Sequence, residues 1–158
     1  MKKSKIKLPL RKNYLVIIEN SKGAKIFQDC FGKNRKIKNL TEKEALSCAF
    51  FVSSILYLCG LISKIHLSVK GVVKDMKKSG WFEICQPRKG SVLLWEEKNG
   101  HYHLGFYLGR QKAISNNFQK KTIRIHHFTY HGKRKIEKIF WHKKLDSSKT
   151  LLTTIQEP

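Results

Sequence analysis

The segment from Ala45 to Ile62 reads ALSCAFFVSSILYLCGLI and carries no charged residue, whereas lysine is frequent elsewhere. A segment of this length suits a membrane-spanning helix of roughly 17 to 25 residues, and it also suits the most buried helix of a small domain. The strands predicted after it need a shared core, because a sheet must bury at least one face. We therefore interpret the segment as a buried helix and expect no transmembrane segment.

Two starting points for this helix fit the sequence. Thr41 lies three residues before Glu44, which is the spacing of a capping box, and Ser47 offers a second start. In the first turn of a helix, unpaired N–H groups and the positive end of the helix dipole lower the pKa of a cysteine thiol. We expect the start at Ser47, which places Cys48 where a thiolate is stabilised; a start at Thr41 makes Cys48 a packing residue.

Hydrophobic spacing predicts one more helix and an early hairpin. Apolar residues recur at i, i+3, i+4 and i+7 between Ser68 and Ser79, which indicates an amphipathic helix that ends at Gly80. Near the N-terminus, Tyr14 to Ile18 is rich in β-branched residues. A turn-like stretch follows it, and then the short run AKIF. This order predicts two short strands around a turn.

From Trp81 onward the period of the apolar positions changes to two, and Asn99-Gly100 is typical of a tight hairpin turn. Strands are expected at Ser91 to Glu96, Tyr102 to Leu108, Lys112 to Asn116, Thr122 to Phe128 and Ile136 to Trp141. Helices followed by antiparallel strands predict an α+β domain with the helices on one face of the sheet. We place this single domain at residues 14–145, between a basic, flexible arm (1–13) and a polar tail (146–158).

Composition is that of a globular protein with a large excess of positive charge. Of the 158 residues, 41% are hydrophobic and 11% aromatic, which excludes a disordered chain. Thirty-three Lys and Arg against eleven Asp and Glu give a net charge of +22. A field of this sign attracts polyanions, which include nucleic acid, anionic lipid and acidic cell-wall polymers.

The four cysteines of the chain are Cys30, Cys48, Cys59 and Cys85. They form no CxxC pair and no spacing typical of a disulfide framework, so we expect thiols, with no cofactor and no metal. The basic N-terminus is followed by only a short apolar run, YLVII, so no signal peptide is evident. The cytoplasm and export by another route both remain open as compartments.

Three segments, in chain order, carry candidate chemistry. The first, SCAFFVSSIL, holds Cys48 at or near a helix start, and the second, PRKGSVLLWEE, turns at Pro87 and Gly90 into an apolar strand. The third, HYHLGFYLG, holds His103 and two glycines that allow other backbone to come close. A thiol needs a base to form its thiolate, and a histidine on a rigid strand can supply one. Cys48 is therefore the candidate nucleophile and His103 the candidate base.

The order of these segments, and the motif HLGFYLG above all, resembles the papain-fold cysteine peptidases of the NlpC type and their CHAP relatives, from Leu46 to Asn117. The resemblance implies a papain-like fold, with a central buried helix packed on a mainly antiparallel sheet. It also implies cleavage of amide bonds in peptidoglycan peptides, with Cys48 as nucleophile and His103 as base and then acid. The positive surface would hold such an enzyme on an anionic cell-wall polymer. The chain departs from the family pattern at Ser47 and Ser91, where the family often has acidic residues.

Strand pairing predicts the third residue of the candidate site, which would orient His103. If Arg110-Gln111 forms a two-residue turn, alternation places Asn116 on the face of His103 and Ser115 on the opposite face. We expect Asn116 in this role, and a register shift of one residue would favour Ser115. The further alternatives are His126 or His127 for the orienting role and His101 for the base.

A second interpretation keeps the papain-like scaffold but not the catalysis. Segments such as RIHHFTYHGKRK combine cations with aromatic rings, which suits phosphate contact and base stacking. The chain has no helix-turn-helix, zinc-finger or RNP-like pattern. The alternative is therefore a non-catalytic, strongly basic module that binds nucleic acid or another polyanion. Nothing in the sequence indicates the oligomeric state.

Overall fold

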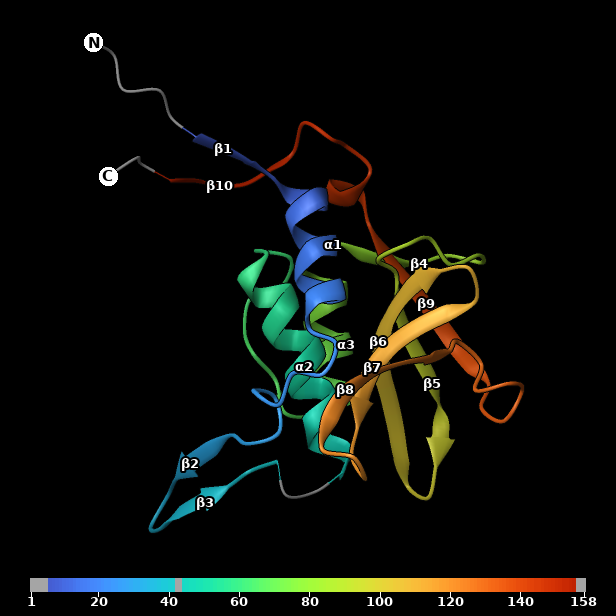
Figure 1. Ribbon diagram of the computed structural model, residues 1–158. Coiled ribbons are helices and arrows are strands. Elements are labelled where there is room, and N and C mark those ends of the chain that lie inside the picture. Colours follow the sequence, from blue (N-terminus) through green and yellow to red (C-terminus); the bar gives the residue numbers. More distant parts are fainter. Residues whose placement is uncertain (1–5, 42–43, 156–158) are drawn as a thin grey trace.

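The computed structural model describes residues 6–41 and 44–155, and Figure 1 shows helices packed beside a twisted sheet. Within these residues the helices are α1 (Leu10–Asn20), α2 (Glu44–Leu58) and α3 (Val69–Lys78). The strands of the main sheet are β4 (Trp81–Glu83), β5 (Val92–Lys98), β6 (His101–Gly109), β7 (Lys112–Asn117), β8 (Thr122–His127) and β9 (Ile136–His142). They lie in the order β4-β9-β5-β6-β7-β8, and every pairing is antiparallel. The predicted α+β class is confirmed.

The two faces of this sheet are covered differently. All three helices contribute to one core, which includes Tyr14 from α1, Phe51 from α2 and Met76 from α3, packed on Phe106 of β6 and Ile114 of β7. The opposite face carries a smaller apolar cluster of Leu93, Trp95 and Ala113, which is covered by side chains of β6, of β9 and of the connection between β8 and β9. The five strands predicted from the period of two are therefore present, and the helices lie on one face as expected.

The predicted N-terminal hairpin is wrong, because residues Leu10–Asn20 form helix α1. Leu10, Tyr14 and Ile18 recur every four residues and are all buried, so they form one helical face. The Tyr14 hydroxyl donates a hydrogen bond of 2.7 Å to the Gly90 carbonyl, which fixes α1 to the turn before β5. Tertiary packing along this face therefore outweighs the β propensity of the residues between them.

Helix α2 is the central buried helix that the sequence predicts, but it begins at Glu44, so the expected start at Ser47 is wrong. Thr41 precedes the helix in a turn, and its hydroxyl donates to the carbonyl of Gln28. The helix ends at Leu58, and Gly60, at a φ of 64°, makes the left-handed turn that closes it. No helix in the described part of the chain is long and apolar enough to cross a membrane.

A buried carboxylate ties α3 to the loop after α2. Asp75 accepts hydrogen bonds from the backbone N–H of Ser63 (3.1 Å) and Lys64 (3.0 Å) and from the hydroxyl of Ser79 (3.0 Å). His66 Nε2 lies 2.8 Å from the same carboxylate. Burial alone would raise the pKa of Asp75, but the hydrogen bonds from His66, Ser63 and Ser79 hold that pKa below its usual range. The carboxylate is thus the ionised centre of a structural network.

Two small sheets complete the fold. Strand β1 (Ile6–Pro9) pairs with β10 (Leu151–Ile155), so parts of the expected flexible arm and polar tail form an antiparallel pair. Strands β2 (Phe31–Lys33) and β3 (Ile37–Asn39) form a hairpin that projects from the body (Figure 1). Residues 1–5 and 156–158 of the arm and tail lie outside the described residues. The short 3-10 helix η1 (Lys143–Leu145) follows β9.

Candidate active site

A β-bulge decides which residue of β7 faces His103. Arg110 and Gln111 have φ values of 48° and 60°, so they form the predicted two-residue turn, and Gly109 pairs with Lys112. The register then shifts at Leu108, so that Tyr107 pairs with Ala113 and Gly105 with Ser115. Partners in an antiparallel ladder point to the same face, and so do residues two apart. His103 therefore shares its face with Ser115, and the predicted placement of Asn116 on that face is wrong.

Ser115 is the centre of a hydrogen-bonded group on this face. Its hydroxyl lies 2.9 Å from Nε2 of His103, 2.8 Å from Nε2 of His126 and 3.3 Å from the hydroxyl of Tyr130. The His126 and Tyr130 rings are stacked, with their centroids 4.1 Å apart. These contacts fix the His103 imidazole from β7, β8 and the loop that follows β8.

The same contacts assign the proton positions. Nδ1 of His126 lies 2.9 Å from the carbonyl of His127, which can only accept, so Nδ1 carries the proton. Burial lowers the pKa of His126, so its ring is neutral at pH 7 and its Nε2 accepts the Ser115 proton. The Ser115 oxygen in turn accepts from Nε2–H of His103. The neutral His103 ring therefore has its lone pair on Nδ1, which is the nitrogen that can act as a base.

Asn116 performs a different task, on the face covered by the helices. It is buried, its Nδ2 donates a hydrogen bond of 2.6 Å to the hydroxyl of Ser47, and its Oδ1 accepts from Gln28. Ser47 lies on α2, one residue before Cys48. Asn116 thus joins the end of β7 to the beginning of α2, and it makes none of the hydrogen bonds that the structure gives His103.

The ring of Trp95 packs against the ring of His103. Trp95 pairs with His103 across β5 and β6, their ring centroids are 5.4 Å apart, and the Trp95 Nε1–H donates a 2.7 Å bond to the carbonyl of Phe128. Gly105 makes this packing possible: a Cβ there would lie 2.5 Å from the Ile114 carbonyl oxygen and 3.0 Å from the Trp95 ring. The expectation that glycines of HLGFYLG allow a close approach is confirmed for Gly105.

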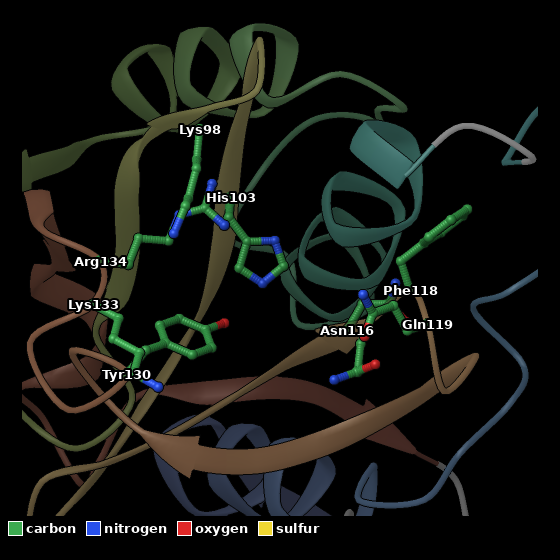
Figure 2. A pocket seen from close by; sticks show the side chains of 9 residues that line it. Lys98, His103, Asn116, Phe118, Gln119, Tyr130, Lys133 and Arg134 are labelled. Atoms are coloured by element: carbon green, nitrogen blue, oxygen red, sulfur yellow. The ribbon is translucent and has the colours of Figure 1, made fainter.

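His103 opens into a pocket of about 280 Å³ at the end of the sheet. The other lining residues are Lys98, Asn116, Asn117, Phe118, Gln119, Tyr130, Lys133 and Arg134. Figure 2 shows Lys98, Arg134 and Lys133 on one side of the imidazole and Phe118 and Gln119 on the other. His103 therefore lies between a cationic wall and a wall of amide and aromatic side chains.

Cys48 lies on α2 close to this group, and it is only 1% exposed. Burial raises the pKa of its thiol to about 11, although hydrogen bonding from the Leu104 backbone and the charge of Arg134 act in the opposite direction. The expectation that its position stabilises a thiolate is therefore wrong. The charge of Cys48 also influences the pKa of Tyr130, and the ring of Tyr130 contacts the ring of His103.

The pKa of His103 is also shifted. Burial, and then the charge of Arg134, lower the pKa of His103 to about 3. At pH 7 these shifts leave Cys48 as a neutral thiol and His103 as a neutral imidazole.

The remaining sequence candidates have other surroundings. His101 is exposed, and its carbonyl accepts a 2.8 Å hydrogen bond from Arg134. His127 points away from Ser115, and its ring stacks on His131 at 4.5 Å. Within the described residues no group of three or more His, Cys, Asp or Glu side chains is arranged to hold a metal ion. Of the alternatives for the orienting role, only Ser115 contacts His103 directly, and His126 acts through Ser115.

The sequence analysis did not assign Tyr130 or Arg134 to the site. Both lie in the connection between β8 and β9, within the run TYHGKRK that begins at Thr129, and they reach the pocket only because this connection folds back over the sheet. The signal that could have indicated them is the combination of aromatic and basic residues in this segment. The chain matches no known protein-family profile and no curated protein.

Proposed function

We propose that the protein is a cysteine hydrolase with a papain-like fold of the NlpC type, which cleaves amide bonds in peptides such as those of peptidoglycan. The observation that carries the proposal is the hydrogen-bonded group at Ser115, because it leaves the Nδ1 lone pair of His103 available to take a proton. A base that is held in one tautomer on a rigid strand is what thiol activation requires. Ser115 takes the orienting role in place of Asn116.

The reaction follows from these positions. Sulfur of Cys48 attacks the amide carbon while its proton passes to Nδ1 of His103, and the C–S bond forms. The C–N bond then breaks as Nδ1 of His103 gives the proton to the leaving amine, and a thioester remains. His103 next takes a proton from water, the resulting hydroxide attacks the thioester, and the acid is released with the thiol restored.

Variants of two cysteines test this proposal. Cys48 is buried in α2, whereas Cys85 is exposed beyond β4 and serves as the matched control. Purified peptidoglycan is incubated with each variant, and new amino groups are measured. We expect Cys48→Ala to abolish amine release and Cys85→Ala to retain it. Equal amine release by the Cys48→Ala variant and the unmodified protein would refute the hydrolase.

A non-catalytic polyanion-binding module is the second candidate, and the β2–β3 hairpin favours it. This hairpin carries four exposed cations and no acidic residue between Phe31 and Asn39. Phe31 and Ile37 share one of its faces and are 66% and 69% exposed. Binding to duplex DNA or to an acidic polysaccharide that weakens steeply with salt and is unchanged by Cys48→Ala would support this candidate.

A further inference from the structure

The cationic wall of the pocket has no acidic counterpart in the described residues. Lys98, Lys133 and Arg134 line one side of the pocket, no Asp or Glu lines it, and none of the three cations forms a salt bridge with a described carboxylate. Elsewhere the carboxylate of Glu83, for example, lies within 4 Å of Lys77 and Lys138. Three cations without a counter-charge repel one another, and a bound anion would relieve that repulsion.

Arg134 is held in place by neutral acceptors, so its charge remains available. Its Nε and Nη2 donate to the carbonyl of Glu96 at 3.2 and 3.0 Å, and Nη2 also donates to the carbonyl of His101 at 2.8 Å. These bonds orient the planar group without cancelling its charge. A guanidinium fixed in this way is well suited to a planar oxyanion, because little side-chain freedom is lost on binding.

The opposite wall has a different chemistry. Asn117 at the end of β7, and Phe118 and Gln119 in the turn that follows, supply amide groups and one aromatic ring. Amide side chains match the N–H and C=O groups of a peptide backbone, which can donate and accept at once. A ligand that spans the pocket therefore meets cations on one side of His103 and peptide-like partners on the other (Figure 2).

We propose that the wall formed by Lys98, Lys133 and Arg134 binds a carboxylate of an acidic peptide, so that the amide bond next to this carboxylate lies over His103. Binding of the carboxylate does not depend on catalysis, whereas the placement of the amide bond rests on the hydrolase proposed above. A phosphate group would use the same cations, and the experiment below separates the two anions.

The binding test uses the Cys48→Ala variant, which holds peptide without turnover. The probe is the peptide mixture released from purified peptidoglycan, before and after its carboxylates are converted to carboxamides, and the heat of binding gives the dissociation constant. We expect the carboxamide mixture to bind at least about tenfold more weakly, because a charged hydrogen-bonded pair is worth about 1.5 to 3 kcal/mol. Equal affinity of the two mixtures would overturn the proposal.

Paired variants locate the site. Lys98→Gln with Lys133→Gln removes two charges from the wall, and Lys143→Gln with Lys144→Gln removes two from η1, at the opposite end of β9. We expect the first pair to weaken carboxylate binding about tenfold or more and the second to change it less than about twofold. Equal effects would show a general attraction to positive charge and would refute a local site. Stronger displacement of the peptides by glycerol phosphate than by acetate would assign the wall to phosphate and overturn the carboxylate.

The hydrolase can fail separately. If the Cys48→Ala variant binds the carboxylate mixture as expected but the unmodified protein releases no amine from it, the wall stands and the catalytic proposal falls. If amine release depends on Cys48 but proceeds at the same kcat/KM on both mixtures, catalysis stands and the wall falls. For the Lys98 and Lys133 variant of the active protein, we expect KM to rise and kcat to stay within about twofold.

Discussion

Gly105 lies directly opposite Ser115 across β6 and β7, and the space where its Cβ would stand is filled by the Ser115 side chain, 2.8 Å away, and by the Ile114 carbonyl. The glycine therefore sets how closely β7 approaches the face that carries His103. Any larger residue must push against a backbone oxygen, which cannot rotate away as a flexible side chain would.

From this contact we expect Gly105→Ala to lower the free energy of unfolding by about 1 to 3 kcal/mol and to disturb the hydrogen bond between His103 and Ser115. Denaturant unfolding measures the first effect, and amine release from peptidoglycan measures the second. Gly23→Ala is the control, because nothing lies within 4 Å of its Cβ position and only its φ of 79° is unfavourable. A Gly105→Ala variant with unchanged stability and activity would contradict the close approach.

The orienting role that we propose for Ser115 predicts a specific change in the tautomer of His103. We expect Ser115→Ala to lower kcat by about 10- to 100-fold, equivalent to about 1.5 to 3 kcal/mol, since a buried hydrogen bond to the base is lost. Nitrogen NMR of the imidazole should show the proton on Nε2 in the unmodified protein and a mixture of tautomers in the variant. An unchanged mixture in both proteins would remove Ser115 from this role.

Asn116→Ala serves as the comparison for that experiment. This substitution removes the hydrogen bonds to Ser47 and Gln28 but none to His103. We therefore expect it to reduce stability while the His103 tautomer is preserved.

The four thiols should differ in reactivity in an order set by burial. The pKa of Cys48 is raised from 9.0 to about 11, which reduces its thiolate about a hundredfold at neutral pH. We expect iodoacetamide at pH 7.5 to label the exposed Cys85 first and Cys48 at least about a hundredfold more slowly, as measured by peptide mass spectrometry. Faster labelling of Cys48 than of Cys85 would show that the resting protein already holds a thiolate.

Stability should be greatest between about pH 6.5 and pH 9. The pKa of His103 is lowered from 6.5 to about 3 on folding, so below pH 6.5 the unfolded chain binds a proton that the folded protein does not, and stability falls as the pH decreases toward 3. The pKa of Cys48 is raised above 9.0, so the unfolded chain loses its proton first, and stability falls as the pH rises from 9 toward 11. Each group contributes a slope of at most about 1.4 kcal/mol per pH unit.

Thermal unfolding across pH 4 to 10 measures this profile, and His103→Gln should flatten its acidic side. The lowered pKa values of His126 and His142 act in the same direction as that of His103, so part of the acidic slope should remain in the variant. A midpoint that rises on acidification from pH 6.5 to pH 5 would contradict the burial of these imidazoles.

Asp75 should be the most sensitive carboxylate of the fold. Asp75→Asn places an amide NH₂ opposite groups that only donate, such as the backbone N–H of Ser63 and Lys64, and we expect a loss of about 2 to 4 kcal/mol in the free energy of unfolding. Glu97→Gln, at an exposed position of β5, is the matched control and should change stability by less than about 0.5 kcal/mol. Equal stabilities of the two variants would show that the network contributes little.

Periodicity predicts most of this fold, and it fails where packing overrides local preference. The strands after Trp81 and helix α3 follow from alternation and from helical spacing, because each buries one face. Helix α1 is missed because Tyr14 to Ile18 is rich in β-branched residues, which favour strands. Its helical spacing, with Leu10, Tyr14 and Ile18 four residues apart, becomes evident only when these side chains pack on the core. The strands β5 through β9 can therefore be predicted from the sequence, whereas helix α1 cannot.

The candidate site is predicted in part for a similar reason. His103 and the neighbouring position on β7 follow from the motif HLGFYLG and from the turn at Arg110-Gln111. The bulge at Leu108 adds one residue to β6, so Ser115 and Asn116 lie on the opposite faces to those predicted. No residue of the strand indicates this bulge in the sequence. Likewise, Tyr130 and Arg134 reach the site because of the path taken by the connection between β8 and β9. That path depends on the three-dimensional fold.

The pairing of β1 with β10 has a practical consequence for handling the protein. Figure 1 shows this pair at the end of the molecule away from the first turn of α2 and from the turn between β7 and β8, which borders the pocket. A tether placed at either terminus would therefore present the pocket to the surrounding solution. Immobilisation on a sensor surface through the N-terminus and through the C-terminus should accordingly give the same affinity for a soluble ligand, without shielding the imidazole.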